Sequence, residues 1–199
     1  MDKTWLYHYG PETTQQSMEW WHRISPRPKK LRVQKSAGKV LASIFWDQYG
    51  ILLIDYLPKG LTINAEYYSS LLVQLKDILK EKHCGKVTKG VLFLHDNVPA
   101  HQALAAQKKL ADLGFQCLDH PPYSLDLAQS DYHLFTGLKK QLEGCHFSSN
   151  MEVVAAVETW FGRQPSEFFL SGLQKLEQWA KKFIELRGSM LNKSCVWSL

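Results

Sequence analysis

Apolar and polar residues alternate along the chain in blocks that predict strands and helices in mixed order. Short runs of β-branched and aromatic residues, ended by glycine or proline, are typical of strands. Such runs occupy residues 4–9, 40–46, 51–57, 91–94 and 115–118, and the turn ending in Gly50 predicts a hairpin between the second and the third. The run at 91–94 is wholly apolar, so we expect this strand to be central and buried on both faces.

Longer stretches carry apolar residues at the spacing of one helix face. They predict helices from a cap at Thr62 or Asn64 to about residue 82, and over residues 100–113, 131–143, 150–162 and 165–186. Gly114 ends the second helix, and Ser130 is the expected N-cap of the third. The order strand, hairpin, helix, strand, helix, strand, helices matches an α/β fold of RNase H-like type, with a mixed five-stranded sheet flanked by helices.

Length and composition narrow the class of protein. The 199 residues suffice for one well-cored domain, and we treat residues 1–199 as a single domain. No signal peptide opens the chain and no apolar run approaches the ~18 residues of a membrane span, so we expect an intracellular, soluble protein without a membrane partner. The four cysteines are scattered, without a C-x-x-C pair, which predicts reduced thiols rather than a zinc site or disulfides.

Positive charge is concentrated in one stretch of the sequence. The net charge of +5 favours a polyanionic partner, although a modest excess of lysine is also compatible with an ordinary soluble surface. Residues 25–35 contain two prolines and no acid, and they follow the pair Trp20–Trp21. The stretch is either a solvated loop or a nucleic-acid contact. Its five basic residues are Arg27, Lys29, Lys30, Arg32 and Lys35.

Two acids stand where predicted elements begin or end. Asp96 follows the strand at 91–94, and Asp131 lies in the first turn of a helix, on the face that carries apolar residues. Each alone is compatible with a structural role, as a turn former or a first-turn helix acid. Together, carboxylates from separate elements at one rim of a sheet suit Mg²⁺, which prefers hard oxygen ligands. No nucleophile elbow or catalytic cysteine offers a rival chemistry.

Three motifs bear a resemblance to a known family. They are His-Asp-Asn at 95–97, Pro-Pro-Tyr-Ser at 121–124, and an acid separated from Asp96 by 34 residues. With Asp2 in the opening Met-Asp-Lys-Thr-Trp, the chain resembles the catalytic core of mariner-type (Tc1/mariner) transposases, whose acids follow a DD34D pattern. From this resemblance we expect a catalytic domain alone, without that family's N-terminal helix-turn-helix DNA-binding region.

The resemblance implies a function and a set of site residues. Asp2, Asp96 and Asp131 would be catalytic and would hold Mg²⁺ or Mn²⁺ for DNA strand cleavage and strand transfer, with His95, Asn97 and Tyr123 supporting them. Residues 10–38 would form a basic, clamp-like loop that contacts DNA and a partner subunit. The resemblance also implies a nuclear location and a homodimer.

The chain departs from the family pattern at four positions: Lys3, Val98, Leu125 and Gln129. These substitutions predict a loosened site, and the free amino group beside Asp2 leads us to expect Asp2 to be disordered or swung away. At most one weakly bound metal ion would then remain. Two alternatives to an active enzyme stay open: a decayed copy that serves as a DNA-binding or dimerisation module, and a reading frame with no selected role.

Overall fold

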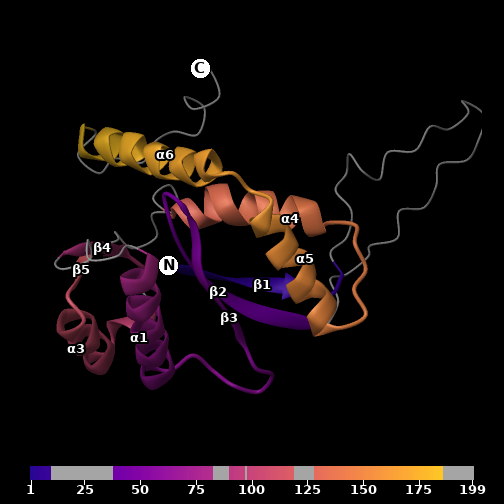
Figure 1. Cartoon of the computed structure of the whole chain (residues 1–199), viewed down its shortest axis with the longest axis horizontal. Helices are drawn as coiled ribbons and strands as arrows, with labels where there is room; N and C mark the ends of the chain where they lie inside the picture. The colour runs from indigo at the N-terminus through magenta and orange to yellow at the C-terminus, as the bar shows by residue number, and fades with distance from the viewer. Residues whose placement is uncertain (10–37, 83–89, 97, 119–127, 186–199) are drawn as a thin grey trace, which may run out of the picture.

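Two small sheets form the centre of the protein in the computed structural model, which describes residues 1–9, 38–82, 90–96, 98–118 and 128–185 (Figure 1). The first sheet is antiparallel, in the order β1 (Asp2–Tyr7), β2 (Lys39–Asp47) and β3 (Gly50–Leu57). The second pairs β4 (Val91–Leu94) with β5 (Phe115–Leu118) in parallel. The mixed α/β prediction is confirmed.

The single five-stranded sheet that we expected is not found among the described residues. β1 pairs with β2 along its whole length, and its first residue partners Ile44. β4 meets this sheet at its last residue, where the Met1 amino group donates a hydrogen bond of 2.7 Å to the Leu94 carbonyl oxygen. A sheet ladder needs residues side by side along both strands, and here β4 and β1 lie nearly end to end.

The described residues form six α-helices and one π-helical turn, and local capping chemistry accounts for several helix ends. α1 (Ala65–Lys82) begins after Asn64, whose Oδ1 accepts a hydrogen bond of 2.8 Å from the Tyr67 amide. α5 (Asn150–Gly162) is capped by the Ser149 hydroxyl and matches its predicted range. α6 (Ser166–Glu185) also lies close to its prediction.

The helix expected over residues 100–113 is interrupted. α2 (Pro99–Gln102) and α3 (Leu104–Asp112) are separated by Ala103, whose ψ of 138° is extended rather than helical. The break frees the His101 carbonyl oxygen, which accepts a hydrogen bond of 2.9 Å from the Gln107 side chain instead. The prediction of one continuous helix was therefore wrong. The non-helical conformation of Ala103 is stabilised by the Gln107 side chain, which lies one turn later.

The helix expected from residue 131 begins as a π-helical turn, η2 (Ser130–Phe135), and continues as α4 (Thr136–Leu142). Ser130 is not its N-cap. The residue is buried inside η2, and its hydroxyl accepts a hydrogen bond of 3.1 Å from the Trp46 indole of β2. This contact ties η2 to the central sheet.

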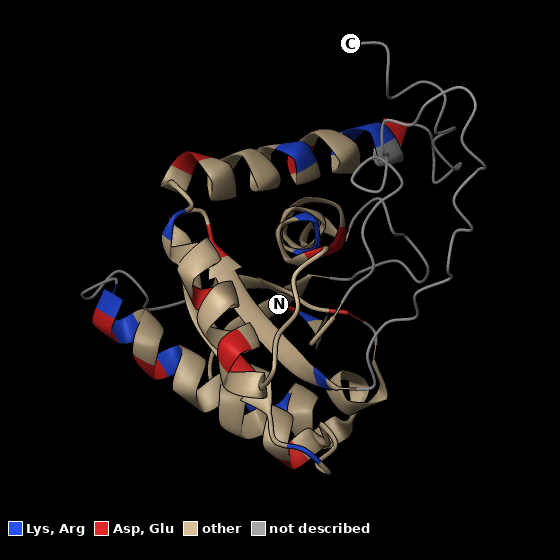
Figure 2. Ribbon diagram, turned by 90° about the vertical axis from the view of Figure 1, so that its right-hand side faces the viewer, with Lys and Arg blue, Asp and Glu red and all other residues tan. Residues whose placement is uncertain are grey.

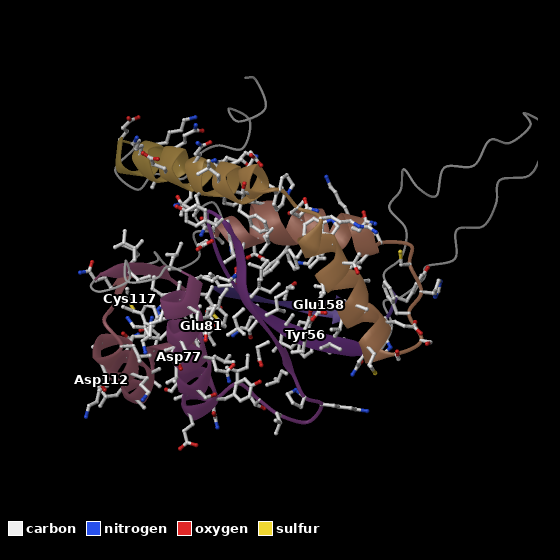
Figure 3. The ribbon with its side chains drawn as sticks, viewed as in Figure 1. Tyr56, Asp77, Glu81, Asp112, Cys117 and Glu158 are labelled. Carbon is white, nitrogen blue, oxygen red and sulfur yellow. The ribbon has the colours of Figure 1, made fainter. Side chains whose placement is uncertain are left out.

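The three-stranded sheet is covered on both faces (Figure 1). One core joins Ala42, Ile44 and Trp46 of β2 to apolar residues of η2, α4, α5 and α6. The second core joins Phe45 to α1, α3, β4 and β5. Figure 3 shows Tyr56 of β3 under α5, where burial, and then the charge of Glu158, raises the pKa of its hydroxyl.

β4 is less buried than expected. Phe93 faces the second core, but Leu92, on the opposite side of the strand, is 64% exposed, and Leu118 of β5 is 43% exposed. The expectation of burial on both faces was wrong, because the described helices cover this small sheet on its Phe93 face. Within the described ranges, no helix has the length and apolar character needed to cross a bilayer.

A core substitution behind η2 tests this packing. Leu138→Ala should lower the free energy of unfolding by about 2–5 kcal/mol, because the Leu138 side chain is fully buried and its removal leaves a cavity. Leu104→Ala is the matched control: Leu104 is 86% exposed, and its loss should change stability by less than about 0.5 kcal/mol. Urea denaturation measures both, and equal effects would contradict the described core.

Candidate active site

Asp96 stands directly after β4 and is held by two cationic or hydrogen-bonding side chains. The His101 Nδ1 lies 2.6 Å from the Asp96 Oδ1, and it also lies 3.2 Å from the Asp96 carbonyl oxygen. The Lys3 ammonium lies 3.9 Å from Oδ2. Burial opposes ionisation of Asp96, but His101, Lys3 and His95 together outweigh it, and the net effect lowers the pKa. Asp96 is therefore ionised near neutral pH.

Asp2 is the first residue of β1, and its position corrects our expectation of a disordered acid. It pairs with Ile44 in the sheet, and its Oδ1 accepts a hydrogen bond of 2.7 Å from the Lys3 amide. Burial, together with the negative charges of Asp131 and Asp96, raises the pKa of Asp2 to about 7 against the opposing hydrogen bond from the Lys3 amide. The ladder to β2 holds this end of the chain in place, which the sequence argument had left out.

Asp131 lies in the first turn of η2, between the buried Ser130 and the core residues that follow. We expected Asp131 to lie on the helix face that carries apolar residues. In η2 the residue is instead exposed, whereas Leu134 and Phe135 of the same turn are buried. Burial still raises the pKa of its carboxyl, as does Asp96, while Lys139 opposes them.

The three acids come from β1, from the end of β4 and from η2, and they sense one another's charge. Asp131 and Asp96 raise the pKa of Asp2, and Asp96 raises that of Asp131. Among the described residues, no three His, Cys, Asp or Glu side chains are placed as a finished ligand set. The donors are hard carboxylate oxygens in a region of excess negative charge, and both properties fit Mg²⁺ or Mn²⁺.

Basic groups of the chain already lie within this acidic region. Lys3 follows Asp2 in β1, but its ammonium lies 3.9 Å from the Asp96 Oδ2. The Met1 amino group is buried, which lowers its pKa to about 6 against the opposing effect of Asp2 and Asp96. Near neutral pH Lys3 therefore compensates the carboxylates, whereas the Met1 amino group is largely uncharged.

The other predicted site residues divide into described and undescribed ones. His95 is buried, and its Nδ1 forms a hydrogen bond of 2.9 Å with the Tyr68 hydroxyl. Val98 precedes Pro99 in an extended conformation, and Gln129 is buried beside η2. Asn97, Tyr123 and Leu125 lie outside the described residues. So do the basic residues Arg27, Lys29, Lys30, Arg32 and Lys35.

His101 is a site residue that our sequence reasoning missed. It is completely buried, and its ring stacks on Tyr68 of α1 with centroids 4.0 Å apart. The available signal was its position five residues after Asp96, on the first helical turn after Pro99. A short turn at the end of a strand can return such a side chain to the acid.

Comparisons with known proteins identify relatives of this chain. The family described as "Transposase (partial DDE domain)" matches residues 10–89. Over 183 residues the chain is 32% identical to the mariner Mos1 transposase of Drosophila mauritiana. The matched region covers 90% of this chain and 52% of that protein. The chain thus spans about half the length of this relative.

Solved structures of Mos1 share the fold. The Mos1 transposase catalytic domain with raltegravir and Mg superposes with a TM-score of 0.72 at 34% identity, covering 77% of this chain and 78% of that chain. The Mos1 mariner paired end complex with Mn gives a TM-score of 0.86 at 30% identity, covering 96% of this chain and 55% of that chain.

The fold and the family match together identify a transposase catalytic domain of mixed α/β architecture. More particularly, the chain belongs to the mariner-type transposase family.

The raised pKa of Asp2 predicts a pH-dependent stability in the presence of a chelator. An acid whose pKa rises from 3.8 to about 7 on folding stabilises the fold most below pH 3.8, and this stability is lost as the pH rises through 7. Asp2→Asn keeps the uncharged state at every pH. Relative to the parent chain it should gain stability between pH 4 and 7, by up to about 1.4 kcal/mol per pH unit. Parallel stability curves from urea titrations would contradict the burial of Asp2.

Proposed function

We propose that this chain is the catalytic core of a mariner-type transposase that cleaves and joins DNA strands with the help of Mg²⁺ or Mn²⁺. The observation that carries the proposal is the convergence of Asp2, Asp96 and Asp131 from three elements, close enough to shift one another's pKa. Membership of the family supplies the reaction class. The complexes of Mos1 with Mn and with Mg support the choice of metal.

The acids have distinct tasks in this proposal. Asp96, ionised and held by His101, would be the permanent anionic ligand. Asp96 and Asp2 would share one metal ion, and Asp131 would complete the site of a second ion. Asp2 must lose a proton to act as a ligand, because its pKa is about 7 in the metal-free chain. When bound, a pair of divalent ions stabilises the attacking and leaving oxygens of a phosphoryl transfer.

DNA is the proposed partner, with a homodimer as the proposed assembly and the nucleus as the proposed location. Along the described helices Lys and Arg are interspersed with Asp and Glu rather than gathered on one face (Figure 2). The proposed phosphate contacts are therefore the basic residues of the clamp-like loop at 10–38, of which Arg27, Lys29 and Lys30 are the centre. The Mos1 transposase paired-end complex with left transposon end supports DNA as the class of partner.

One observation favours a second candidate, a decayed DNA-binding or dimerisation module. The Lys3 ammonium, 3.9 Å from Asp96, places a fixed positive charge where a divalent cation would approach. A chain that no longer uses the metal would tolerate or favour such a lysine. Metal binding and DNA cleavage separate the two candidates.

Metal-dependent nicking of supercoiled plasmid DNA tests the proposed activity. The parent chain should nick DNA with Mg²⁺ or Mn²⁺ and lose this activity with a chelator, and Asp96→Asn should reduce the rate by at least about a hundredfold. Asp77→Asn is the control, since Asp77 is an exposed acid of α1 paired with Lys80. No nicking by the parent chain, or equal nicking by Asp96→Asn, would favour the decayed module.

Removal of the competing charge should improve metal binding. Lys3→Gln is expected to tighten Mn²⁺ binding roughly fivefold, because a partly exposed ion pair such as Lys3–Asp96 contributes up to ~1 kcal/mol. The matched control is Lys39→Gln on the adjacent strand β2, where the lysine lies over the Trp5 ring. Calorimetric titration measures both variants, and an affinity unchanged by Lys3→Gln would show that this ammonium does not oppose the metal.

A further inference from the structure

The geometry around His101 points to a positioning residue: we propose that His101 orients the Asp96 carboxylate for metal binding, through a buried ring stack that fixes the imidazole. This inference rests on the proposed function, because it names the group that prepares one of the proposed ligands. The ring stack is formed by Tyr68 of α1, His95 just after β4 and His101 of α2. None of these three side chains needs to touch DNA or metal.

The hydrogen-bonding capacity of His101 is directed at Asp96. Nδ1 forms a hydrogen bond of 3.2 Å with the Asp96 carbonyl oxygen and lies 2.6 Å from Oδ1 in an ion-pair contact, so Nδ1 carries a proton and donates it to Asp96. Nε2 is buried and has no hydrogen-bond partner among the described residues. Burial of a polar ring with one nitrogen unsatisfied costs free energy. The contact between His101 Nδ1 and Asp96 offsets part of the cost of burying the His101 ring.

The ring itself is held by aromatic neighbours. Tyr68, fully buried on α1, stacks on His101 with centroids 4.0 Å apart, and His95 lies nearly parallel to it at 5.3 Å. The Tyr68 hydroxyl is hydrogen-bonded to the His95 Nδ1, which fixes the outer ring of the stack. An imidazole packed in this way cannot turn freely, so the direction of its Nδ1–H is set by the core.

The freedom of Asp96 explains why such a partner is needed. Asp96 lies two residues after a strand of only four residues, and its side chain is 33% exposed. A carboxylate in this position would otherwise sample several rotamers, and a metal ligand must be held within a narrow range of orientations. His101 fixes one oxygen and leaves Oδ2, which faces Lys3, for a cation.

Two variants separate the hydrogen bond from the packing. His101→Phe keeps a ring against Tyr68 and removes the donor, whereas His101→Asn places an amide N–H near the position of Nδ1. We expect His101→Phe to remain folded and to weaken Mn²⁺ binding roughly 10- to 100-fold, and His101→Asn to recover most of that loss. His146→Phe is the control, because His146 stacks on Tyr9 at the other end of β1 and makes no contact with the acids.

The experiment has a metal-free arm and a Mn²⁺ arm. In the metal-free chain, imidazole nitrogen NMR should show a protonated Nδ1 on His101 and a change in its N–H signal in Asp96→Asn. An unprotonated Nδ1, or a signal indifferent to Asp96→Asn, overturns the inference. In the second arm, equal Mn²⁺ affinity of the parent and His101→Phe overturns it as well. If the parent binds no Mn²⁺ the proposed function fails, and the NMR arm alone then decides the role of His101.

Discussion

Repulsion among the carboxylates of Asp2, Asp96 and Asp131 is the physical constraint on which the proposed site depends. Like charges that approach one another in a partly buried region raise the free energy of the ionised state. Burial and, after it, the neighbouring carboxylates raise the pKa of Asp2 and of Asp131, while His101 and Lys3 keep Asp96 ionised. The metal-free chain therefore holds more negative charge in one place than its own cations balance, which is the condition that attracts a divalent ion.

The packing of β2 brings these acids together. Because side chains of a strand alternate between its faces, Ile44 and Trp46 enter one core and Phe45 enters the other. The first core anchors η2, through the hydrogen bond of Trp46 to Ser130, and so places Asp131. The second core anchors β4 and the aromatic stack beneath Asp96. Asp2 pairs directly with Ile44 of β2. The positions of all three acids therefore depend on this one strand.

Local patterns in the sequence predicted the elements well and their distortions poorly. The cap at Asn64, the range of α5 and the strands at 91–94 and 115–118 follow from residues close in sequence. The break at Ala103 and the use of Ser130 as an acceptor for Trp46 depend on distant partners, which periodicity does not reveal. For the site, the motifs located the three acids, but a disordered Asp2 was wrong because its pairing with β2 was not considered. His101 was missed because its orientation depends on Tyr68, a residue of another helix.

The central claim is that the three acids form one site for a divalent cation, and carboxyl-carbon NMR during a Mn²⁺ titration tests it most directly. Paramagnetic broadening falls steeply with distance, so it reports which carboxylates the ion approaches. We predict that the signals of Asp2, Asp96 and Asp131 broaden together at the lowest Mn²⁺ concentrations. The signals of Asp77 on α1 and Asp112 on α3, which Figure 3 shows on two separate helices, should stay sharp. Broadening of Asp77 or Asp112 first, or of all acids equally, would contradict the account.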